Sequence, residues 1–532
     1  MSKKEFIIII FFSFFVFVFA NFAQFWGMIN TPPGMVFLGG HLPTSGEILS
    51  MVYPQMKDGF LLTKNLFTSE EQPRIFFASS YLPLVVIGKV FPLSDLMIFL
   101  VGKLLFTFIL FFIFWRYISF VINKDKDKIF HLFVMSLTGG LGFLLMFFVP
   151  SAIDLWIPEY TVFHTILYTA SFIYSQILML LVFYLLYSFF HKGRKLKLLF
   201  ASLVSVLLAF EHQFDILTIA LTVFLFIGFT QSKIKNFFRQ KVLLLLTLLP
   251  AFLVIVLQFF LIKQFVNVAA WTKQTHLDNP SLISFIVGFG IIGFLAVKNV
   301  FRSPWEKMSL FYKLNFFWFI SSLFLVFMPI PFQRRFLEGI YIPLTIFATP
   351  LLIDTLSNLW QKIKTKTIKL PFLRLFFYPS VLLFLTSSNI FLIYQDIKVF
   401  NFEKQTSPFY IYQDDLVGLD FIKKHSTDSE IILSDGHYSH LIPGLIGRPV
   451  YFGHTVGTGL TINPEEKTEA AKKFFLEDDE NYRKKFLTKN NIKFLFLGKK
   501  ASDTEDFKLW EQKDYLIKIY DLNNVKVFKV KN

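Results

Sequence analysis

The sequence predicts a polytopic α-helical membrane protein with about 11 transmembrane helices and a C-terminal α/β domain. The 532-residue chain is 54% hydrophobic and only 17% charged, and 74 of its residues are Phe. A soluble domain is about 45–50% apolar and about 25% charged. This excess of apolar residues excludes a soluble globular enzyme and a disordered protein. The absence of Cys excludes a disulfide-stapled scaffold, thiol chemistry and Cys metal sites.

The distribution of charge divides the chain into two predicted domains. Residues 1–396 hold 32 Lys and Arg against 17 Asp and Glu, whereas residues 397–532 hold 21 against 20. Nearly all of the net charge of +16 therefore lies in the apolar part. We expect a basic membrane domain over 1–396 and a near-neutral, water-soluble domain over 397–532.

The membrane domain is predicted from segments long and apolar enough, or nearly so, to cross about 30 Å of hydrocarbon. They are residues 5–29, 95–122, 129–150, 161–190, 198–212, 214–230, 242–262, 282–300, 309–329, 336–359 and 372–396. The first resembles a signal peptide, but its apolar run is about 20 residues long and no small-residue cleavage site follows, which favours a retained helix. The stretch 75–92 is shorter and is expected to dip into the membrane or lie on its surface.

The orientation follows from the positive-inside rule, which places Lys-rich and Arg-rich short loops in the cytoplasm. The basic loops are residues 191–197, 231–241, 298–313 and 361–374. With these loops inside, the N-terminus is cytoplasmic and the tail from residue 397 is extracytoplasmic. The long loop 30–74 then lies outside, and its length is typical of a functional loop. A multi-pass protein of the plasma (inner) membrane is expected.

The tail is expected to be a small α/β domain, because short β-rich runs alternate with polar helical segments. Strands are predicted at 430–434, 492–497, 515–520 and 525–530, the last two as a hairpin; helices are predicted at 412–425, 465–476 and 479–490.

Arg334 and Arg335 lie in the segment PFQRRFLEG, on the predicted outer side, where positive charge is normally depleted. The planar guanidinium fork suits phosphate or carboxylate. One interpretation is that one of the two arginines holds the phosphate of a lipid-linked substrate. The alternative is an ion pair with Glu338 or snorkelling to ordinary lipid phosphates.

Further polar groups interrupt apolar sequence at predicted helix ends, where ionisable residues often indicate function. His212 and Asp215 are three residues apart, so in a helix they share one face. They are candidates for contact with a substrate hydroxyl or phosphate, or simply cap the turn. Glu159 and His164, which flank the start of the predicted span 161–190, are also substrate-binding candidates. No third ligand completes a metal site here and no cofactor is expected, whereas the sequence leaves dependence on a metal ion open.

Carboxylates of the first outer loop are candidates for a general base. Glu47 follows Ser45-Gly46 and precedes ILSMVYPQM, a plausible short surface helix. A carboxylate at the start of that helix would be ionised and oriented, which suits proton abstraction. The alternative is a helix-end charge without chemistry. Asp58, beside Gly59 in a predicted turn, is the second candidate.

The layout resembles the GT-C superfamily of polytopic glycosyltransferases, and more specifically the bacterial dolichyl-phosphate-mannose-type and lipopolysaccharide-core-type enzymes. The segments that carry the resemblance are PPGMVFLGG, NLFTSEEQ, DLWIPEYTVFH, EHQFDILT, PFQRRFLEG and GRPVYFGHT. Glu47 stands where that family usually has Asp, and Gln213 stands where Pro is expected.

The resemblance implies an integral-membrane glycosyltransferase of the hexosyltransferase type. Its donor would be a sugar on a polyprenyl phosphate or diphosphate, and its acceptor would be an unidentified component of the cell envelope. Membrane lipids would surround the protein. A first-loop carboxylate would deprotonate the acceptor hydroxyl, which attacks the anomeric carbon with inversion, and cationic side chains would stabilise the departing phosphate. Two alternatives stay open: a transporter or flippase of lipid-linked sugars, and a noncatalytic envelope scaffold. No nucleic-acid partner is expected, because the basic loops are short and separate.

Overall fold

A computed structural model describes residues 2–40, 50–76, 78–230, 237–265, 267–269, 279–329, 332–365, 371–402, 409–453, 461–477, 479–499 and 513–531. The chain divides into two compact units. Unit 1 comprises residues 1–23, 100–257 and 277–396, and unit 2 comprises residues 24–99, 258–276 and 397–532. The first outer loop therefore belongs to the same unit as the tail, whereas the sequence assigns it to the membrane domain.

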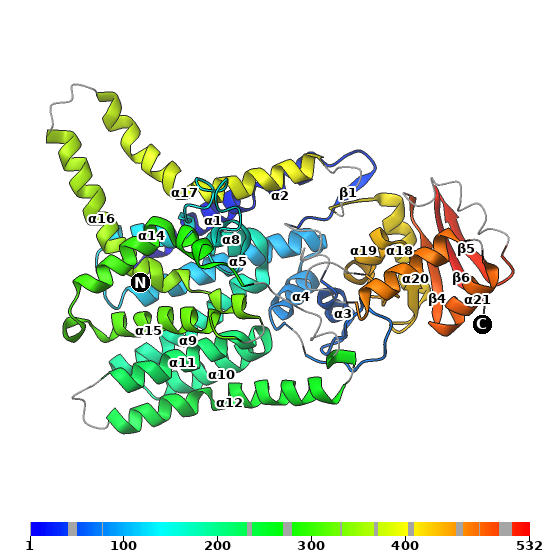
Figure 1. The fold of residues 1–532 in the computed structure, drawn as a ribbon, viewed down its shortest axis with the longest axis horizontal. Coiled ribbons are helices and arrows are strands. Elements are labelled where there is room, and N and C mark those ends of the chain that lie inside the picture. The colour runs from blue at the N-terminus through cyan, green and yellow to red at the C-terminus, as the bar shows by residue number, and fades with distance from the viewer. Residues whose placement is uncertain are drawn as a thin grey trace. The chain divides into compact units, whose positions relative to one another are not determined.

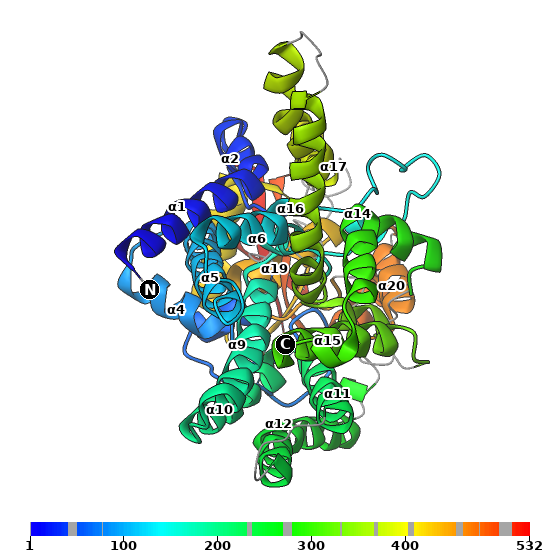
Figure 2. The same ribbon diagram turned by 90° about the vertical axis from the view of Figure 1, so that its left-hand side faces the viewer.

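Unit 1 is helical (Figures 1 and 2). Its helices, some of which continue into unit 2, are α1 (Lys3–Ala20), α5 (Asp95–Ile118), α6 (Asp125–Leu137), α7 (Ile153–Trp156), α8 (Val162–Tyr168), α9 (Ala170–Lys192), α10 (Leu196–Glu211), α11 (Gln213–Phe229), α12 (Phe237–Gln264), α14 (Leu282–Arg302), η2 (Trp305–Lys307), α15 (Leu310–Val326), η3 (Gln333–Leu337), α16 (Tyr341–Thr365) and α17 (Pro371–Phe402). In Figure 2, α9, α10 and α11 lie side by side.

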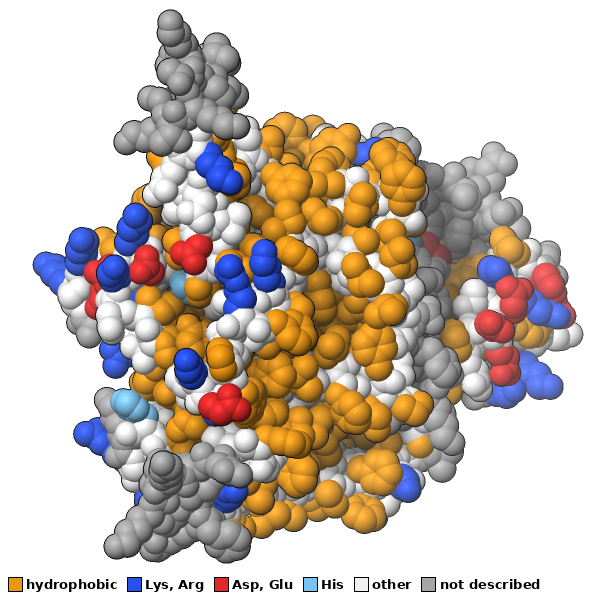
Figure 3. All heavy atoms as spheres, turned by 60° about the vertical axis from the view of Figure 1, so that its left-hand side comes forward, with side chains coloured by type: hydrophobic (Ala, Val, Ile, Leu, Met, Phe, Trp, Pro, Cys, Tyr) orange, Lys and Arg blue, Asp and Glu red, His pale blue; other side chains and the backbone are white. Residues whose placement is uncertain are grey.

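Six helices of the described residues are long and apolar enough to cross a membrane, and a seventh span results if α1 and α2 (Phe22–Ile29), bent by 57°, are counted together. The predicted number of about 11 is not confirmed. Large apolar side chains remain exposed on these helices, among them Leu105, Leu246, Leu253 and Phe294. On the face drawn in Figure 3, hydrophobic side chains form a broad band and Lys and Arg gather along one edge of it. Such a band is expected where lipid tails replace water.

The predicted span 129–150 is wrong as a continuous helix, because α6 ends at Leu137. The chain then continues through Thr138-Gly139-Gly140, and glycine is a poor helix former. Backbone bonds to other helices replace the helical ones: the Gly139 N–H donates to Leu385 O at 3.0 Å, and the Leu141 N–H donates to Val287 O at 2.9 Å. Because these backbone N–H groups have hydrogen-bond partners, the irregular segment can persist within an apolar bundle.

The predicted span 161–190 is also interrupted, since α8 ends at Tyr168 and α9 begins at Ala170. Lys103 of α5 is 4% exposed, and its ammonium group donates to Leu167 O and Tyr168 O, both at 3.1 Å. A helix end leaves carbonyl groups without intrahelical partners. Lys103 supplies donors to two of them, which gives a physical reason for the break.

Close packing of two glycines joins the irregular segment to α14. A Cβ atom on Gly140 would overlap the carbonyl of Gly288, and backbone cannot yield as a flexible side chain can. We therefore expect Gly140→Ala to destabilise the folded protein by about 1–3 kcal/mol, the usual cost of overpacking. The matched control is Gly228→Ala in α11, where no heavy atom lies within 4 Å of the added Cβ. The control should be neutral or slightly stabilising. Thermal unfolding in detergent measures both, and equal midpoints for both variants would contradict the prediction.

Unit 2 contains a four-stranded sheet in the order β3-β4-β6-β5. Its strands and helices are α2, β1 (Met35–Phe37), α3 (Val52–Lys57), α4 (Tyr81–Val90), β2 (Tyr410–Tyr412), α18 (Gln413–His425), β3 (Ile431–Leu433), α19 (Gly436–Ile446), α20 (Pro464–Leu476), α21 (Glu480–Lys489), β4 (Ile492–Leu497), β5 (Leu516–Leu522) and β6 (Val525–Val530). β3 pairs parallel to β4, and β6 pairs antiparallel to both β4 and β5. The predicted strands, the hairpin and three helices are therefore present, whereas β1, β2 and α19 had no clear sequence signal.

Strand β4, inside this sheet (Figure 1), is buried on both of its faces. Phe494 and Phe496 of β4 pack with residues of α18 and α19, while Leu495 and Leu497 pack with residues of α20 and α21. This alternation follows from the two-residue period of a strand. A second, two-stranded sheet pairs β1 of the first loop with β2 of the tail, antiparallel. α4 is only 10 residues long, in agreement with a segment 75–92 that is too short to span.

Candidate functional site

One ion pair and one close histidine–carboxylate contact in unit 1 involve residues that the sequence singled out; we call both of them pairs. The Arg335 guanidinium pairs with the carboxylate of Glu159, which is completely buried. His212 Nδ1 lies 2.9 Å from Asp215 Oδ1, and Asp215 is completely buried as well. Burying a charge is costly unless it is paired, so the Arg335 guanidinium stabilises the buried position of Glu159.

Local backbone structure places these side chains. Glu159 follows Pro158 in the turn between α7 and α8, and Arg335 is in the short 3₁₀ helix η3. His212, with φ −147°, separates α10 from α11, and Asp215 is in the first turn of α11. A carboxylate is favoured in the first turn of a helix by the helix dipole.

Phe172 of α9 connects the two pairs. The Arg335 guanidinium lies 5.5 Å from the centre of its ring, and the His212 ring lies 6.4 Å from it in an edge-on arrangement. Asp215 also interacts electrostatically with Glu159 and Arg335. The two pairs are therefore parts of one cluster, although they come from three distant segments of the chain.

Glu338 is a third buried acid of this cluster, and from the sequence we expected it only as a possible ion-pair partner of the arginines. It is 1% exposed and interacts electrostatically with Asp215, Glu159 and Arg335, and it lies beside Gln176. In the alternative interpretation Glu338 was expected to form an ion pair with an arginine. In the structure, Arg335 forms its ion pair with Glu159 instead. The signal for Glu338 was available: an acid directly after PFQRRFL, at the edge of an apolar span.

The cluster therefore contains three buried acids, one guanidinium and one imidazole. Among the described residues, Glu159 Oε2 and His212 Nε2 have no hydrogen-bond partner. Buried polar atoms without partners are uncommon and point to an additional binding partner, such as a ligand or water. Carboxylates and an imidazole can accept hydrogen bonds from sugar hydroxyls. Within the described ranges, no group of three or more His, Asp and Glu side chains is arranged to hold a metal ion.

The other two substrate-binding candidates lie on the same segments. Arg334 is half-buried, with its guanidinium 5.3 Å from the centre of the Trp156 ring. His164 in α8 is 1% exposed, and its backbone N–H donates to Thr161 Oγ1 at 3.1 Å. Arg334 and Arg335 are thus neighbours in sequence that contact different aromatic rings.

The two catalytic candidates belong to the first loop. Glu47 lies outside the described residues. The short helix expected after it is present as α3, which begins at Val52. Asp58 in unit 2 follows the end of α3, and its carboxylate accepts from Lys423 Nζ at 2.8 Å and lies 3.7 Å from Arg448 Nη1. These cations of the tail neutralise Asp58, an arrangement that is unusual for a free general base.

Asp154, which is completely buried beside the same segment of unit 1, offers a pH-dependent test of this region. Burial raises its pKa to about 6, although its Oδ2 accepts from the Gly142 N–H at 3.1 Å. Between about pH 4 and 6 the folded protein retains a proton that the unfolded chain has released. Its contribution to stability therefore falls as the pH rises through this window, by up to about 3 kcal/mol.

We expect Asp154→Asn to remove this dependence. The difference between the unfolding midpoints, variant minus wild type, should increase as the pH rises from 4 to 7. Thermal unfolding in detergent measures both midpoints. Asp420→Asn, which changes a half-exposed acid in α18, should show no such trend. A constant difference between Asp154→Asn and wild type across this range would contradict the prediction.

Comparison with known proteins shows the fold. No family model and no curated protein sequence matches the chain. Solved structures do match: the oligosaccharyltransferase of Archaeoglobus fulgidus, tethered to an acceptor peptide, is 12% identical with a TM-score of 0.53 over 93% of this chain and 69% of its own. ArnT from Cupriavidus metallidurans is 10% identical with a TM-score of 0.51 over 97% of both chains. The chain has a GT-C fold.

The mycobacterial arabinofuranosyltransferase AftD is a third structure with this GT-C fold. It is 10% identical with a TM-score of 0.56. The match covers 100% of this chain and 42% of AftD. The GT-C fold and the apolar helices identify a multi-pass membrane protein. At these identities the likeness extends to the fold and not to individual residues.

Proposed function

We propose that this protein is an integral-membrane glycosyltransferase that moves a sugar from a polyprenyl-phosphate-linked donor to an acceptor of the cell envelope. The observation that carries the proposal is the buried cluster of Glu159, His212, Asp215, Arg335 and Glu338 within a GT-C fold. ArnT, with the same fold, has also been solved with undecaprenyl phosphate bound, at a TM-score of 0.50. That ligand belongs to the chemical class proposed here for the donor.

The residues of the cluster fit the two halves of such a donor. Arg335, with Arg334 beside it in sequence, supplies the guanidinium fork that binds phosphate. Glu159, Asp215, Glu338 and His212 supply acceptors for sugar hydroxyls, and several of their atoms lack a partner among the described residues. His164 lies on the same segment as Glu159.

The proposed reaction is one displacement with inversion. A first-loop carboxylate takes the proton of the acceptor hydroxyl, the hydroxyl oxygen bonds to the anomeric carbon, and the bond from that carbon to the phosphate oxygen breaks. Arg335 stabilises the charge that develops on the leaving phosphate. Of the two candidate bases, Glu47 is favoured, because Asp58 is held by Lys423 and lies near Arg448. The site would lie at the outer face of the plasma (inner) membrane, with the N-terminus cytoplasmic and residues 397–532 extracytoplasmic.

Reconstitution of the full chain in proteoliposomes with a labelled polyprenyl-phosphate sugar tests the proposal. An envelope extract supplies acceptors. We expect transfer of label to a water-soluble or envelope-bound product, with release of the polyprenyl phosphate. Movement of intact labelled lipid across the bilayer without any such product would instead identify a flippase. If the protein neither transfers nor moves the lipid, the scaffold interpretation is favoured.

A further inference from the structure

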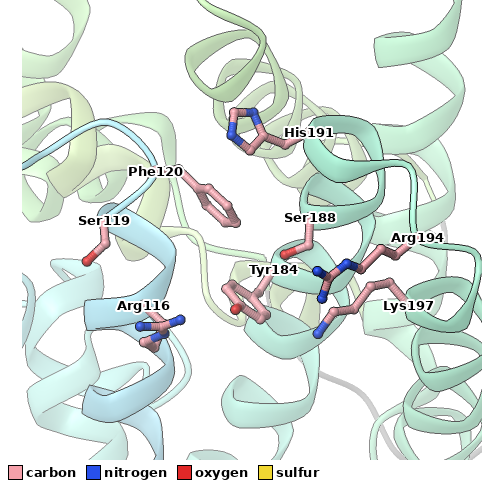
Figure 4. A pocket seen from close by; sticks show the side chains of 8 residues that line it. All are labelled: Arg116, Ser119, Phe120, Tyr184, Ser188, His191, Arg194 and Lys197. Carbon is pink, nitrogen blue, oxygen red and sulfur yellow. The ribbon is translucent and has the colours of Figure 1, made fainter. Parts of the chain in front are cut away.

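A second polar feature of unit 1 is a cavity of about 420 Å³ between the end of α5, the end of α9 and the start of α10. We call it the basic pocket; its lining residues are Arg116, Ser119, Phe120, Tyr184, Ser188, His191, Arg194 and Lys197. Figure 4 shows Arg194 and Lys197 extending toward Tyr184 from one side, with Arg116 on the other side. None of these residues belongs to the cluster around Glu159 and Arg335.

The lining of the basic pocket carries positive charge without compensating acids. It includes three permanent cations and one histidine, and no Asp or Glu. Within the described part of the chain, Arg116, Arg194 and Lys197 form no ion pair with a carboxylate. Arg116 and Arg194 are exposed, whereas Lys197 is half-buried and lies 5.9 Å from the centre of the Tyr184 ring. Like charges gathered around one cavity attract an anion.

The position of the basic pocket on α9 places it away from the candidate site. α9 is one of the helices that can cross a membrane. Gln176, beside Glu338, is near its beginning, and His191 is at its end. Fifteen residues of helix separate them, which correspond to about 22 Å along the axis. The two sites therefore lie toward opposite ends of one membrane-crossing helix, and the basic pocket is at the end with the basic loop 191–197.

Apolar surface continues from the basic pocket along α10. Leu196, Leu199, Phe200 and Leu203 are 61%, 56%, 48% and 54% exposed. They follow Arg194 directly and alternate with the buried residues Leu198 and Ala201. A water-soluble phosphate compound has no apolar part that could pack against this surface, whereas the acyl chain of a lipid would cover it. Cationic pockets between transmembrane helices bind anionic lipid headgroups in this way.

We propose that the basic pocket binds the phosphate headgroup of an anionic phospholipid, whose acyl chains lie along the exposed face of α10. Arg116 and Arg194 donate to the phosphate oxygens through their guanidinium forks, and Lys197 contributes a third positive charge. The lipid belongs to the leaflet at the basic end of α9, away from the proposed donor site. This inference does not depend on the proposed transferase activity.

Binding is measured by native mass spectrometry of the full-length protein in neutral detergent, with dioctanoyl phosphatidic acid as the probe. Each Lys or Arg near a phosphate contributes about a fivefold gain in affinity. The triple variant Arg116→Gln, Arg194→Gln, Lys197→Gln should therefore bind the probe about 100-fold more weakly than the wild type. Dioctanoyl phosphatidylcholine and inorganic phosphate should both bind far more weakly than the probe, which separates a lipid site from a free-phosphate site.

The matched control removes the same charge from another basic loop. Lys298, Arg302 and Lys307 are exposed, and none of them lines the basic pocket. Their replacement by Gln should leave binding of phosphatidic acid unchanged. Should the triple pocket variant fail to fold, Arg194→Gln alone should weaken binding about fivefold. Unchanged affinity in the pocket variants, an equal loss in the control, or inorganic phosphate binding as tightly as the lipid would each overturn the proposal.

Discussion

Replacing Arg335 by Met is expected to destabilise the protein by about 3–5 kcal/mol, because it leaves the Glu159 carboxylate buried without its cation. The double variant Glu159→Gln, Arg335→Met should recover most of that stability, since it removes both charges. Thermal unfolding in detergent measures both effects. Arg302→Met, which removes an exposed guanidinium at the end of α14, should change stability little.

The double variant also separates a structural role of Arg335 from a role in binding. A hydrogen bond to a charged group contributes about 1.5–3 kcal/mol, so loss of the phosphate contact should weaken donor binding about 10-fold to 150-fold. We expect this loss in the double variant although it is folded. If the double variant is stable and binds the labelled polyprenyl-phosphate sugar as tightly as the wild type, Arg335 has only a structural role, and Arg334 becomes the remaining candidate for the phosphate contact.

Replacing Glu47 by Gln is expected to lower kcat about 10²-fold to 10⁴-fold while donor binding stays unchanged. This range is typical for loss of a general base. The amide has nearly the shape of the carboxylate but cannot take the acceptor proton. Glu47→Asp keeps that function and should retain much of the activity. The measurement is the initial rate of sugar transfer in proteoliposomes, together with equilibrium binding of the labelled donor.

Asp58→Asn provides the comparison for Glu47. It removes the ion pair with Lys423 and the neighbouring contact with Arg448, and partly exposed ion pairs contribute about 0–1 kcal/mol each. We therefore expect a small change in stability and a small change in rate. A variant Asp58→Asn without activity, beside a fully active Glu47→Gln, would reassign the base to Asp58. Full activity of both variants would exclude Glu47 and Asp58 as the general base.

Most helices and strands were predictable from the sequence because local hydropathy and residue periodicity determine them. The apolar runs 282–300 and 372–396 correspond to α14 and α17, and the alternating segment 525–530 corresponds to β6. The errors occurred where tertiary contacts replaced helical hydrogen bonds. The break after Leu137 depends on carbonyl groups of α14 and α17, and the break at Thr169 depends on Lys103 of α5. A hydropathy profile contains neither partner.

The candidate site was predictable as a set of residue types and not as an arrangement. Glu159, His212, Asp215 and Arg335 were identified because an ionisable group in apolar sequence is costly and needs a reason. The pairing of Arg335 with Glu159, and the membership of Glu338, follow from the path of the chain between them. The basic pocket is likewise formed only by the fold, because Arg116 and Arg194 come from segments far apart in the sequence.

The sequence by itself determined that this chain is rich enough in apolar segments to be membrane-embedded, where most of its helices and strands lie, and which polar residues had to be accounted for. Those properties depend on the transfer of each short segment from water to an apolar environment, so neighbouring residues suffice to predict them. Only the tertiary structure decided which acid faces which cation, where helices break, and that three buried carboxylates share one cluster. Electrostatic interactions act through space over a few ångströms, and folding alone brings distant residues within that range.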